Sequence, residues 1–439
     1  MSKTPIFDFV KKYALENNAR LHMPGHKGFG NLGCEKYDIT EIHGADSLFE
    51  ADGIIAESEK NLTDIYNTRA SFYSTEGSSL CIRAMVFMAM QYADGKKKIL
   101  AGRNAHKTFL SALALCDLEA DWLYGSDLYS CKITADELDK ALECGECFAV
   151  YVTNPDYLGN MVHLQSLSDV CHKHGVSLLV DNAHGAYLKF NGLHPMDNGA
   201  DMCCDSAHKT LSCLTGSAYL HVSKNAIHSY EQDAKRAMSM FASTSPSYLI
   251  MTSMDFMNGK MSEKDFEVKL REVFMMSDEL KTSLSHLGFD FSGREKLKIN
   301  IKPKSAGFTG THLCAMMEEK GIYPEFCDDD NLVLMFSCGS TKEDFDKVLD
   351  FFSHVEKKRP VISQPPVVPK LHKAMPVRQA MFSKREQICI KDAVGRILAS
   401  PCVSCPPAIP IAVCGEILDE NAVECFEYYG VKSIDVVKE

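Results

Sequence analysis

Residues 205–211 read DSAHKTL, and the lysine of this stretch, Lys209, lies among small and polar residues. Upstream, residues 180–185 read VDNAHG, where Asp181 ends the apolar run 176–180. A lysine that can form a Schiff base and an acid that holds the pyridine nitrogen protonated are two groups that pyridoxal phosphate (PLP) chemistry requires. The two stretches together therefore predict a PLP site that contains Lys209 and Asp181.

Composition limits the classes of protein to which the chain can belong. Its 439 residues suggest two to three domains. A net charge of −12 argues against nucleic-acid binding, which needs a basic surface. Residues 1–20 lack the apolar core of a signal peptide, and no apolar run approaches the ~18 residues of a membrane span. We therefore expect a cytoplasmic protein that acts on a small molecule and binds neither nucleic acid nor membranes.

The 18 cysteines are scattered along the chain without a secretion signal, which is typical of reduced thiols. Two CxxC pairs occur, Cys144 with Cys147 and Cys402 with Cys405, but about 255 residues of sequence separate them. We interpret these cysteines as small buried residues and expect no metal site.

Short apolar runs alternate with helical patterns through the first half of the chain. The predicted strands are residues 71–74, 98–101, 148–152, 176–180, 202–206 and 217–222. A helix is predicted before them at 55–66, and the helices between them include 80–92 and 167–174. This alternation predicts a largely parallel sheet with helices on both faces and a ligand beyond the carboxyl ends of its strands. Four polar residues lie within a few residues after predicted strands and are expected at that edge: Ser78, His106, Asn154 and Asp181.

The turn at residues 75–79, TEGSS, separates a predicted strand from a predicted helix. Free backbone N–H groups, the helix dipole and hydroxyl groups at such a turn favour a phosphate. A turn that only caps the helix would have the same sequence. A capping role is likewise the alternative to a ligand contact for His106. The loop at residues 21–28 contains two histidines and a lysine, which are suited to anion or substrate contact.

The second half of the chain differs in character. Residues 225–290 are predicted helical, and residues 296–355 alternate short strands and helices as a smaller α/β domain. Residues 357–370 hold four prolines and are predicted to be a linker, which is followed by a helix at 383–400 and a Pro-rich extended run. The expected domains are an N-terminal helix and loop at 1–35, a large PLP domain at 36–250, a small domain at 251–360 and a C-terminal segment at 361–439.

Several ordered motifs resemble those of the Orn/Lys/Arg decarboxylase family. They are LHMPGHKGFG (21–30), DITEIHGADSLFEADGII (38–55), RNAHK (103–107), DNAHG (181–185), SAHKT (206–210) and CPPAIPIAVCGE (405–416). The resemblance covers most of the chain and is closest to the short form of the family. It implies a PLP-dependent transferase-like fold (fold type I), decarboxylation of arginine, lysine or ornithine in polyamine metabolism, and a homodimer or higher homo-oligomer.

The resemblance also implies roles for individual residues. Lys209 would bind PLP covalently, Asp181 would pair with the pyridine nitrogen, and His106 would stack on the ring. The phosphate would be bound by Gly77, Ser78 and Ser79. Ser206 and His208 would flank the phosphate and the Schiff base, and His184 would face the cofactor. The catalytic set is Lys209, His208, Asp181 and His106, with Glu416 and His26 near the substrate.

The chain departs from the family pattern at four positions, which indicates a divergent member. Asn182 replaces an acidic residue, Glu76 alters the phosphate turn, Cys405 replaces an aromatic residue and Ala408 replaces a glycine. The sequence leaves two alternatives open. One is another fold-type I enzyme, an aminotransferase or a carbon–sulfur lyase. An aminotransferase needs an arginine that binds the substrate carboxylate, and no arginine after residue 290 lies in a recognisable motif for this contact. The other is an inactive decarboxylase-like binding protein.

Overall fold

The computed structural model describes residues 2–124, 132–367, 369–405 and 409–439. The chain divides into two compact units. The first unit comprises Met1–Gly95, Phe148–Val150 and Leu164–Lys269, and the second comprises Lys96–Cys147, Tyr151–His163 and Leu270–Glu439. The four domains expected from the sequence stay a prediction. Among the described residues, no helix has the length and apolar character that crossing a membrane would require.

The large sheet has seven strands in the order β1-β7-β6-β5-β4-β2-β3. Their bounds are β1 Ala70–Ser74, β2 Lys98–Gly102, β3 Glu119–Leu123, β4 Cys147–Thr153, β5 Ser177–Asp181, β6 Met202–Asp205 and β7 Ala218–Val222. β5 pairs parallel with β6, and β2 pairs parallel with β3, whereas β7 runs antiparallel to both of its neighbours. The predicted mostly parallel α/β sheet is confirmed, with all six predicted strands present and β3 in addition.

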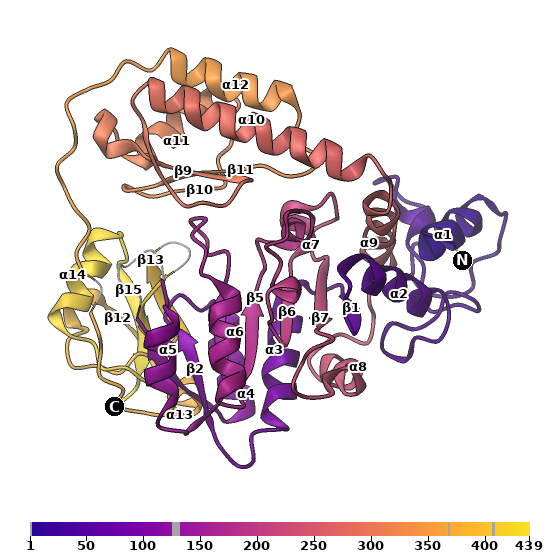
Figure 1. The fold of residues 1–439 in the computed structure, drawn as a ribbon, viewed down its shortest axis with the longest axis horizontal. Helices are drawn as coiled ribbons and strands as arrows, with labels where there is room; N and C mark the ends of the chain where they lie inside the picture. Colours follow the sequence, from indigo (N-terminus) through magenta and orange to yellow (C-terminus); the bar gives the residue numbers. More distant parts are fainter. Residues whose placement is uncertain (1, 125–131, 368, 406–408) are drawn as a thin grey trace. The chain divides into compact units, whose positions relative to one another are not determined.

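The helices of the first unit form where the sequence has a continuous or one-sided apolar surface. α3 (Gly77–Met90) is buried on most sides and packs on β5, β6 and β7, while α6 (Leu164–Lys173) packs on β5. The remaining α-helices are α1 (Pro5–Leu15), α2 (Ile54–Tyr66), α7 (Ala207–Thr210), α8 (Ala234–Ser239) and α9 (Tyr248–Met261) (Figure 1). The 3-10 helices are η1 (Glu35–Tyr37), η2 (Leu48–Glu50), η3 (Ala186–Asn191), η4 (Pro195–Asp197) and η5 (Tyr230–Gln232).

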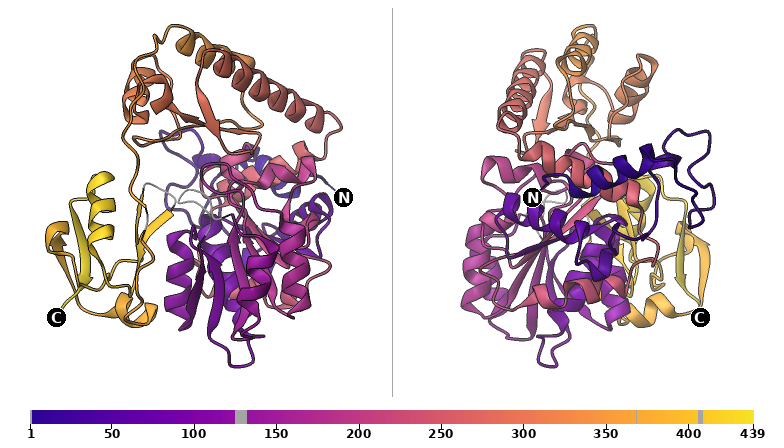
Figure 2. Two further views of the ribbon diagram at one scale, coloured as in Figure 1. Left: turned by 60° about the vertical axis from the view of Figure 1, so that its left-hand side comes forward. Right: turned by 90° about the vertical axis from the view of Figure 1, so that its right-hand side faces the viewer.

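The second unit contains a smaller antiparallel sheet of order β10-β11-β9-β8. Its strands are β8 Asp290–Ser292, β9 Lys298–Lys302, β10 Phe326–Cys327 and β11 Leu332–Met335. α10 (Phe266–His286), α11 (Gly310–Glu319) and α12 (Lys342–Ser353) cover one face of this sheet (Figures 1 and 2). The smaller α/β region predicted at residues 296–355 is therefore present. α4 (Lys107–Cys116), α5 (Ala135–Leu142) and η6 (Pro303–Ala306) complete this part of the unit.

The helix predicted at residues 383–400 is wrong. The structure has a short helix, α13 (Val377–Phe382), followed by β12 (Arg385–Cys389), which pairs antiparallel with β15 (Ser433–Val437). Side chains along β12 alternate between exposed and half-buried, which is the two-residue period of a strand rather than the 3.6-residue period of a helix. Gly395, with φ at +82°, then adopts a left-handed backbone that a helix cannot continue through.

The rest of the C-terminal region forms its own small core. It contains η7 (Ile390–Asp392), β13 (Cys402–Cys405), β14 (Ile409–Val413) and α14 (Glu420–Tyr428). The core includes Leu371, Ile390, Leu398, Ile411, Phe426 and Val436. The described part of residues 357–370 has no helix or strand, as expected for a linker. Two of the noted departures, Ala408 and the side chain of Cys405, lie outside the described residues.

Candidate active site

Three strands of the first unit carry predicted site residues at their carboxyl ends. β1 runs antiparallel to β7, β7 runs antiparallel to β6, and β6 runs parallel to β5. β1, β5 and β6 therefore point in one direction and end at the same edge of the sheet. Ser78 follows β1, Asp181 ends β5 and Ser206 follows β6. This edge is where ligands bind in sheets of this type.

Lys209 lies in α7, directly after the turn that leaves β6. Its Nζ is 3.1 Å from Nε2 of His184, which follows β5 and is buried. The lysine itself is half-buried. An imidazole at this distance can accept a proton from the ammonium group, and the neutral amine is the form that forms covalent bonds to a carbonyl.

Asp181 presents a buried carboxylate at the end of β5, with only 3% of its surface exposed. Oδ1 accepts a hydrogen bond from the backbone N–H of Ala183 at 3.2 Å and lies 3.7 Å from Sγ of Cys204. Burial raises the pKa of the Cys204 thiol well above its usual value, so this neighbour is neutral. A buried carboxylate without a negative neighbour at Cys204 is suited to stabilise a protonated ring nitrogen.

The turn between β1 and α3 leads into a helix N-terminus that carries two serine hydroxyl groups. Gly77 starts α3 with φ at +69°, and its N–H donates to the carbonyl of Gly216 at 2.8 Å. Gly216 also has positive φ, and a Cβ there would lie 3.0 Å from the carbonyl oxygen of Thr75. Ser206 Oγ donates to Ser78 Oγ at 3.0 Å, so two hydroxyl groups meet at the start of the helix. Helix N–H groups and these hydroxyls form a donor set that fits a phosphate.

Two further residues near these motifs have defined backbone partners. His208 Nδ1 is 2.9 Å from the carbonyl oxygen of Ser217 and must carry the hydrogen to donate to it. Glu76, one of the departures from the family pattern, accepts a hydrogen bond from Ser243 N at 2.6 Å. Its carboxylate therefore ties the turn at residues 75–79 to the segment before α9.

His26 lies in the loop between α1 and η1, within the first unit. Its Nε2 is 3.2 Å from Oδ2 of Asp38, and its Nδ1 accepts a hydrogen bond from Gly28 N at 3.0 Å. These bonds give the loop a fixed local conformation. A contact between His26 and the substrate stays a prediction.

His106 belongs to the second unit, where it is the N-cap of α4. Its Nδ1 accepts a hydrogen bond from Thr108 N at 3.2 Å and lies 2.9 Å from Thr108 Oγ1. The capping alternative therefore describes the local role of this histidine. Asn154, the other polar residue expected in this group, follows β4 and has a buried side chain. Stacking of His106 on the cofactor stays a prediction.

Glu416 forms a buried ion pair in the second unit. Its two carboxylate oxygens each accept a hydrogen bond from Arg103 at 2.8 Å, and Oε2 also accepts from Val413 N at 2.9 Å. The guanidinium of Arg103 also lies 5.2 Å from the Trp122 ring and 5.5 Å from the Tyr124 ring. A cationic substrate would therefore have to share this carboxylate with Arg103, and substrate binding by Glu416 stays a prediction.

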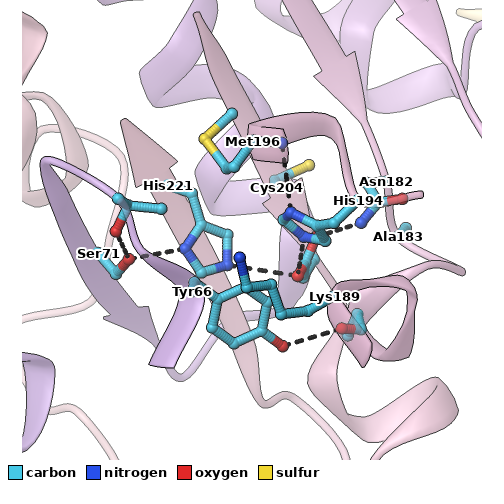
Figure 3. A network of polar contacts seen from close by, with 12 residues as sticks. Tyr66, Ser71, Asn182, Ala183, Lys189, His194, Met196, Cys204 and His221 are labelled. Atoms are coloured by element: carbon cyan, nitrogen blue, oxygen red, sulfur yellow. Dashed lines mark hydrogen bonds and ion pairs between the residues drawn. The ribbon is translucent and has the colours of Figure 1, made fainter. Parts of the chain in front are cut away.

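A buried cluster of His194, Asp205 and His221 had no role in the sequence interpretation. Both Nε2 atoms approach the same oxygen, Asp205 Oδ2, at 3.0 Å and 3.3 Å, and all three side chains are fully buried. Figure 3 labels both histidines and marks their contacts with dashed lines. Burial alone would raise the pKa of Asp205, but the interactions with His194 and His221 hold the pKa below its usual range. Burial lowers the pKa of His221. The sequence did contain one indication of Asp205, because this acid ends the apolar run 202–204. The same pattern had indicated Asp181 as a site residue.

The groups assembled in the first unit fit PLP on their chemistry. They comprise the amine of Lys209, the buried carboxylate of Asp181, and the donor set at the start of α3. PLP requires an amine for covalent attachment, an acid for the ring nitrogen and donors for the phosphate.

Comparison with known proteins adds a family and a set of relatives. Residues 4–290 match the model of the Orn/Lys/Arg decarboxylase major domain, and residues 358–433 match that of the C-terminal domain. An arginine decarboxylase of Halalkalibacterium halodurans is 29% identical, with 95% of this chain and 92% of the relative covered. An arginine decarboxylase of Bacillus subtilis is 27% identical, with 99% and 94% covered.

Solved structures support the fold over the whole chain. Lysine decarboxylase A from Pseudomonas aeruginosa superposes with a TM-score of 0.82 at 16% identity, covering 99% of this chain and 80% of that one. The constitutive lysine decarboxylase of E. coli gives a TM-score of 0.79 at 17% identity, with 99% and 82% covered. At these identities the likeness shows a common fold and leaves the substrate open.

Proposed function

The chain belongs to the Orn/Lys/Arg decarboxylase family and is an enzyme that decarboxylates a basic amino acid; we propose that this amino acid is arginine and that the cofactor is PLP. The observation that carries the choice of arginine is the full-length similarity to proteins named arginine decarboxylase. In the two relatives described above, the match covers at least 92% of the relative. The product would be agmatine, released with CO2.

The proposed cofactor site lies at the edge of the large sheet where β1, β5 and β6 end. Lys209 would hold the cofactor covalently, and Asp181 would keep its ring nitrogen protonated. Ser78 and Ser79, with Ser206, would bind the phosphate through the N-terminus of α3, and Gly77, whose N–H donates to the carbonyl of Gly216, would shape the turn around it. When bound, PLP supplies an electron-withdrawing ring that stabilises the charge left on the substrate as CO2 departs.

Proton movement can be assigned to specific atoms of the chain. His184 Nε2, 3.1 Å from Lys209 Nζ, can take the proton that the lysine must lose before it reacts. His208 is oriented by the bond from its Nδ1 to the carbonyl of Ser217, which leaves Nε2 as its atom for proton transfer. Lys209 or His208 would return a proton to the substrate carbon after CO2 has left.

We propose further contacts of the cofactor and the substrate with the chain. His106 would stack on the ring of the cofactor, and Glu416 and His26 would lie near the substrate. A cytoplasmic location and a homodimer or higher homo-oligomer stay predictions. An aminotransferase or a lyase, and an inactive binding protein, have less support because both domain models that match are those of decarboxylases.

A substrate panel tests this function. Purified protein with PLP is incubated separately with arginine, lysine and ornithine, without a keto acid, and CO2 and amine are measured. We expect agmatine from arginine at the highest kcat/KM, and no product from Lys209→Ala at the same protein concentration. No CO2 from any of the three would overturn the decarboxylase assignment for this chain. A preference for lysine or ornithine would overturn only the choice of arginine.

A further inference from the structure

The two stretches that define the proposed cofactor site are joined by their neighbours. Asn182 follows Asp181 at the end of β5, and Asp205 ends β6, four residues before Lys209. Asn182 Nδ2 donates to Asp205 Oδ1 at 2.6 Å, and Asn182 N donates to the carbonyl of Cys204 at 2.9 Å. Both side chains are completely buried. The bond therefore links the residue beside the proposed ring-nitrogen acid to the segment that carries the proposed PLP lysine.

The hydrogen positions in the cluster around Asp205 are fixed by its outer partners. His194 Nδ1 accepts a hydrogen bond from Met196 N at 3.3 Å (Figure 3). The hydrogen of the neutral ring is therefore on Nε2 and is donated to Asp205. His221 Nδ1 is 2.7 Å from Ser71 Oγ, which can donate to it and leave Nε2–H for the same carboxylate. Asp205 is thus an anion that receives three N–H donors.

The same hydrogen positions argue against a metal ion in this cluster, although its ligand atoms all lie within 4.8 Å of one another. A metal bound at His194 Nε2 would require the hydrogen on Nδ1. That hydrogen would then face the backbone N–H of Met196, and two donors would oppose each other. The cluster is better explained as a set of donors around one carboxylate.

We propose that Asp205, held by His194, His221 and Asn182, is a positioning residue that sets Asp181 and Lys209 relative to each other for PLP. The inference rests on the proposed function, because it assigns those two residues to the cofactor. Asp205 is anchored on Oδ2 by the histidines and holds the end of β5 through Oδ1. Oriented groups of this kind determine how accurately a reactive amine is placed.

The inference explains the departure at position 182. An acid at this position would place a second carboxylate beside Asp205 Oδ1, and two like charges in a buried site repel strongly. The amide of Asn182 supplies a donor instead. Among the described residues, the Oδ1 atom of Asn182 has no hydrogen-bond partner, and this oxygen lies where a Cβ on Gly185 would clash with it. One amide and one carboxylate are therefore matched across the two strand ends.

The test exchanges these two groups. The variants are Asn182→Asp, Asp205→Asn and the double variant with both changes, which restores one amide and one carboxylate. Full-length proteins are compared by the dissociation constant for PLP, followed through the visible absorbance of the bound cofactor, by the melting temperature without PLP, and by kcat and KM for arginine. Should Asn182→Asp fail to fold, Asn182→Ala removes the bond without adding a charge.

We expect each single variant to bind PLP about tenfold more weakly and the double variant to recover most of that loss, because the two sites are coupled. We also expect kcat to fall more than KM rises in the single variants, because positioning acts on the reaction step. A lower melting temperature with unchanged PLP affinity in both single variants would overturn the inference, since it would indicate a purely structural role.

Additive losses in the double variant would also overturn the inference. A wild-type protein that binds PLP but decarboxylates none of the three amino acids would overturn the proposed function, while the PLP affinities would still decide the positioning role. A wild-type protein that binds no PLP would overturn both.

Discussion

Asp205 and Asp255 are both fully buried aspartates of the first unit, but they lie in opposite electrostatic environments. Asp205 receives N–H donors from His194, His221 and Asn182. Asp255 receives backbone N–H donors at the start of α1, among them Phe7 N at 2.8 Å, and the hydroxyl of Ser58. The two residues are of the same type and neither has exposed surface. Their electrostatic environments therefore differ because of their hydrogen-bond partners.

The two carboxyl groups consequently shift in opposite directions. Burial raises the pKa of Asp255 to about 7, and its hydrogen bonds only partly oppose this. Burial acts in the same way on Asp205, but the histidines reverse the effect and hold the pKa below its usual range. Asp205 therefore stays charged at neutral pH, whereas Asp255, which caps the first turn of α1, is protonated far more readily. The donors around a buried acid, more than burial, decide whether it can act as a permanent charge.

The largest expected effect comes from removing one donor from Asp205. His194→Leu leaves the buried carboxylate with fewer hydrogen bonds, and we expect a loss of about 3 kcal/mol in the free energy of unfolding. Urea unfolding of the apoprotein at pH 7.5 measures this change in the free energy of unfolding. His354→Leu is the matched control, because His354 is 77% exposed and should change stability by no more than about 0.5 kcal/mol. Equal losses of stability in the two variants would contradict the claim that the buried hydrogen bond from His194 to Asp205 stabilises the fold.

Much of this arrangement could be predicted from the sequence. Apolar runs that end in polar residues located the strands of the large sheet, and the same pattern located Asp181 and the turn at Ser78. The partners of Asp205 could not be predicted, because His194 and His221 reach it only through the packing of η4 and β7. The ion pair of Arg103 with Glu416 was equally hidden, since 313 residues separate its members. Long-range side-chain pairs depend on tertiary packing, which local pattern does not contain.

The second prediction concerns the pH dependence of Asp255. Because its pKa in the folded state lies above the unfolded value of about 3.9, its contribution to stability is complete at low pH and is lost as the pH rises through about 7. Asp255→Asn cannot titrate, so its stability relative to wild type should increase by about 2 kcal/mol between pH 5 and pH 8. Urea midpoints over this range measure the difference. A constant difference would show that Asp255 has an ordinary pKa.

His221 should give a pH dependence of the opposite sign. Burial lowers its pKa, while its bond to Asp205 opposes this shift. The unfolded chain therefore takes up a proton below about pH 6.5 that the folded chain does not, and wild-type stability falls as the pH falls. His221→Gln lacks this proton, so the stability of wild type relative to the variant should fall by about 1 kcal/mol from pH 7.5 to pH 5.5. If the stability of wild type relative to His221→Gln instead rose from pH 7.5 to pH 5.5, the lowered pKa of His221 would be contradicted.

An exposed aspartate provides the smallest expected effect and sets the scale for the others. Asp346 on α12 forms an i,i+4 pair with Lys342 at 2.6 Å, and its side chain is 60% exposed. Solvent screens such a pair and holding two mobile side chains together costs entropy, so Asp346→Asn should change stability by no more than about 0.5 kcal/mol. The change should shrink further in 1 M salt, where the screening length is about 3 Å. An effect comparable to that of His194→Leu, measured by the same urea unfolding, would mean that burial and donor geometry do not distinguish these acids.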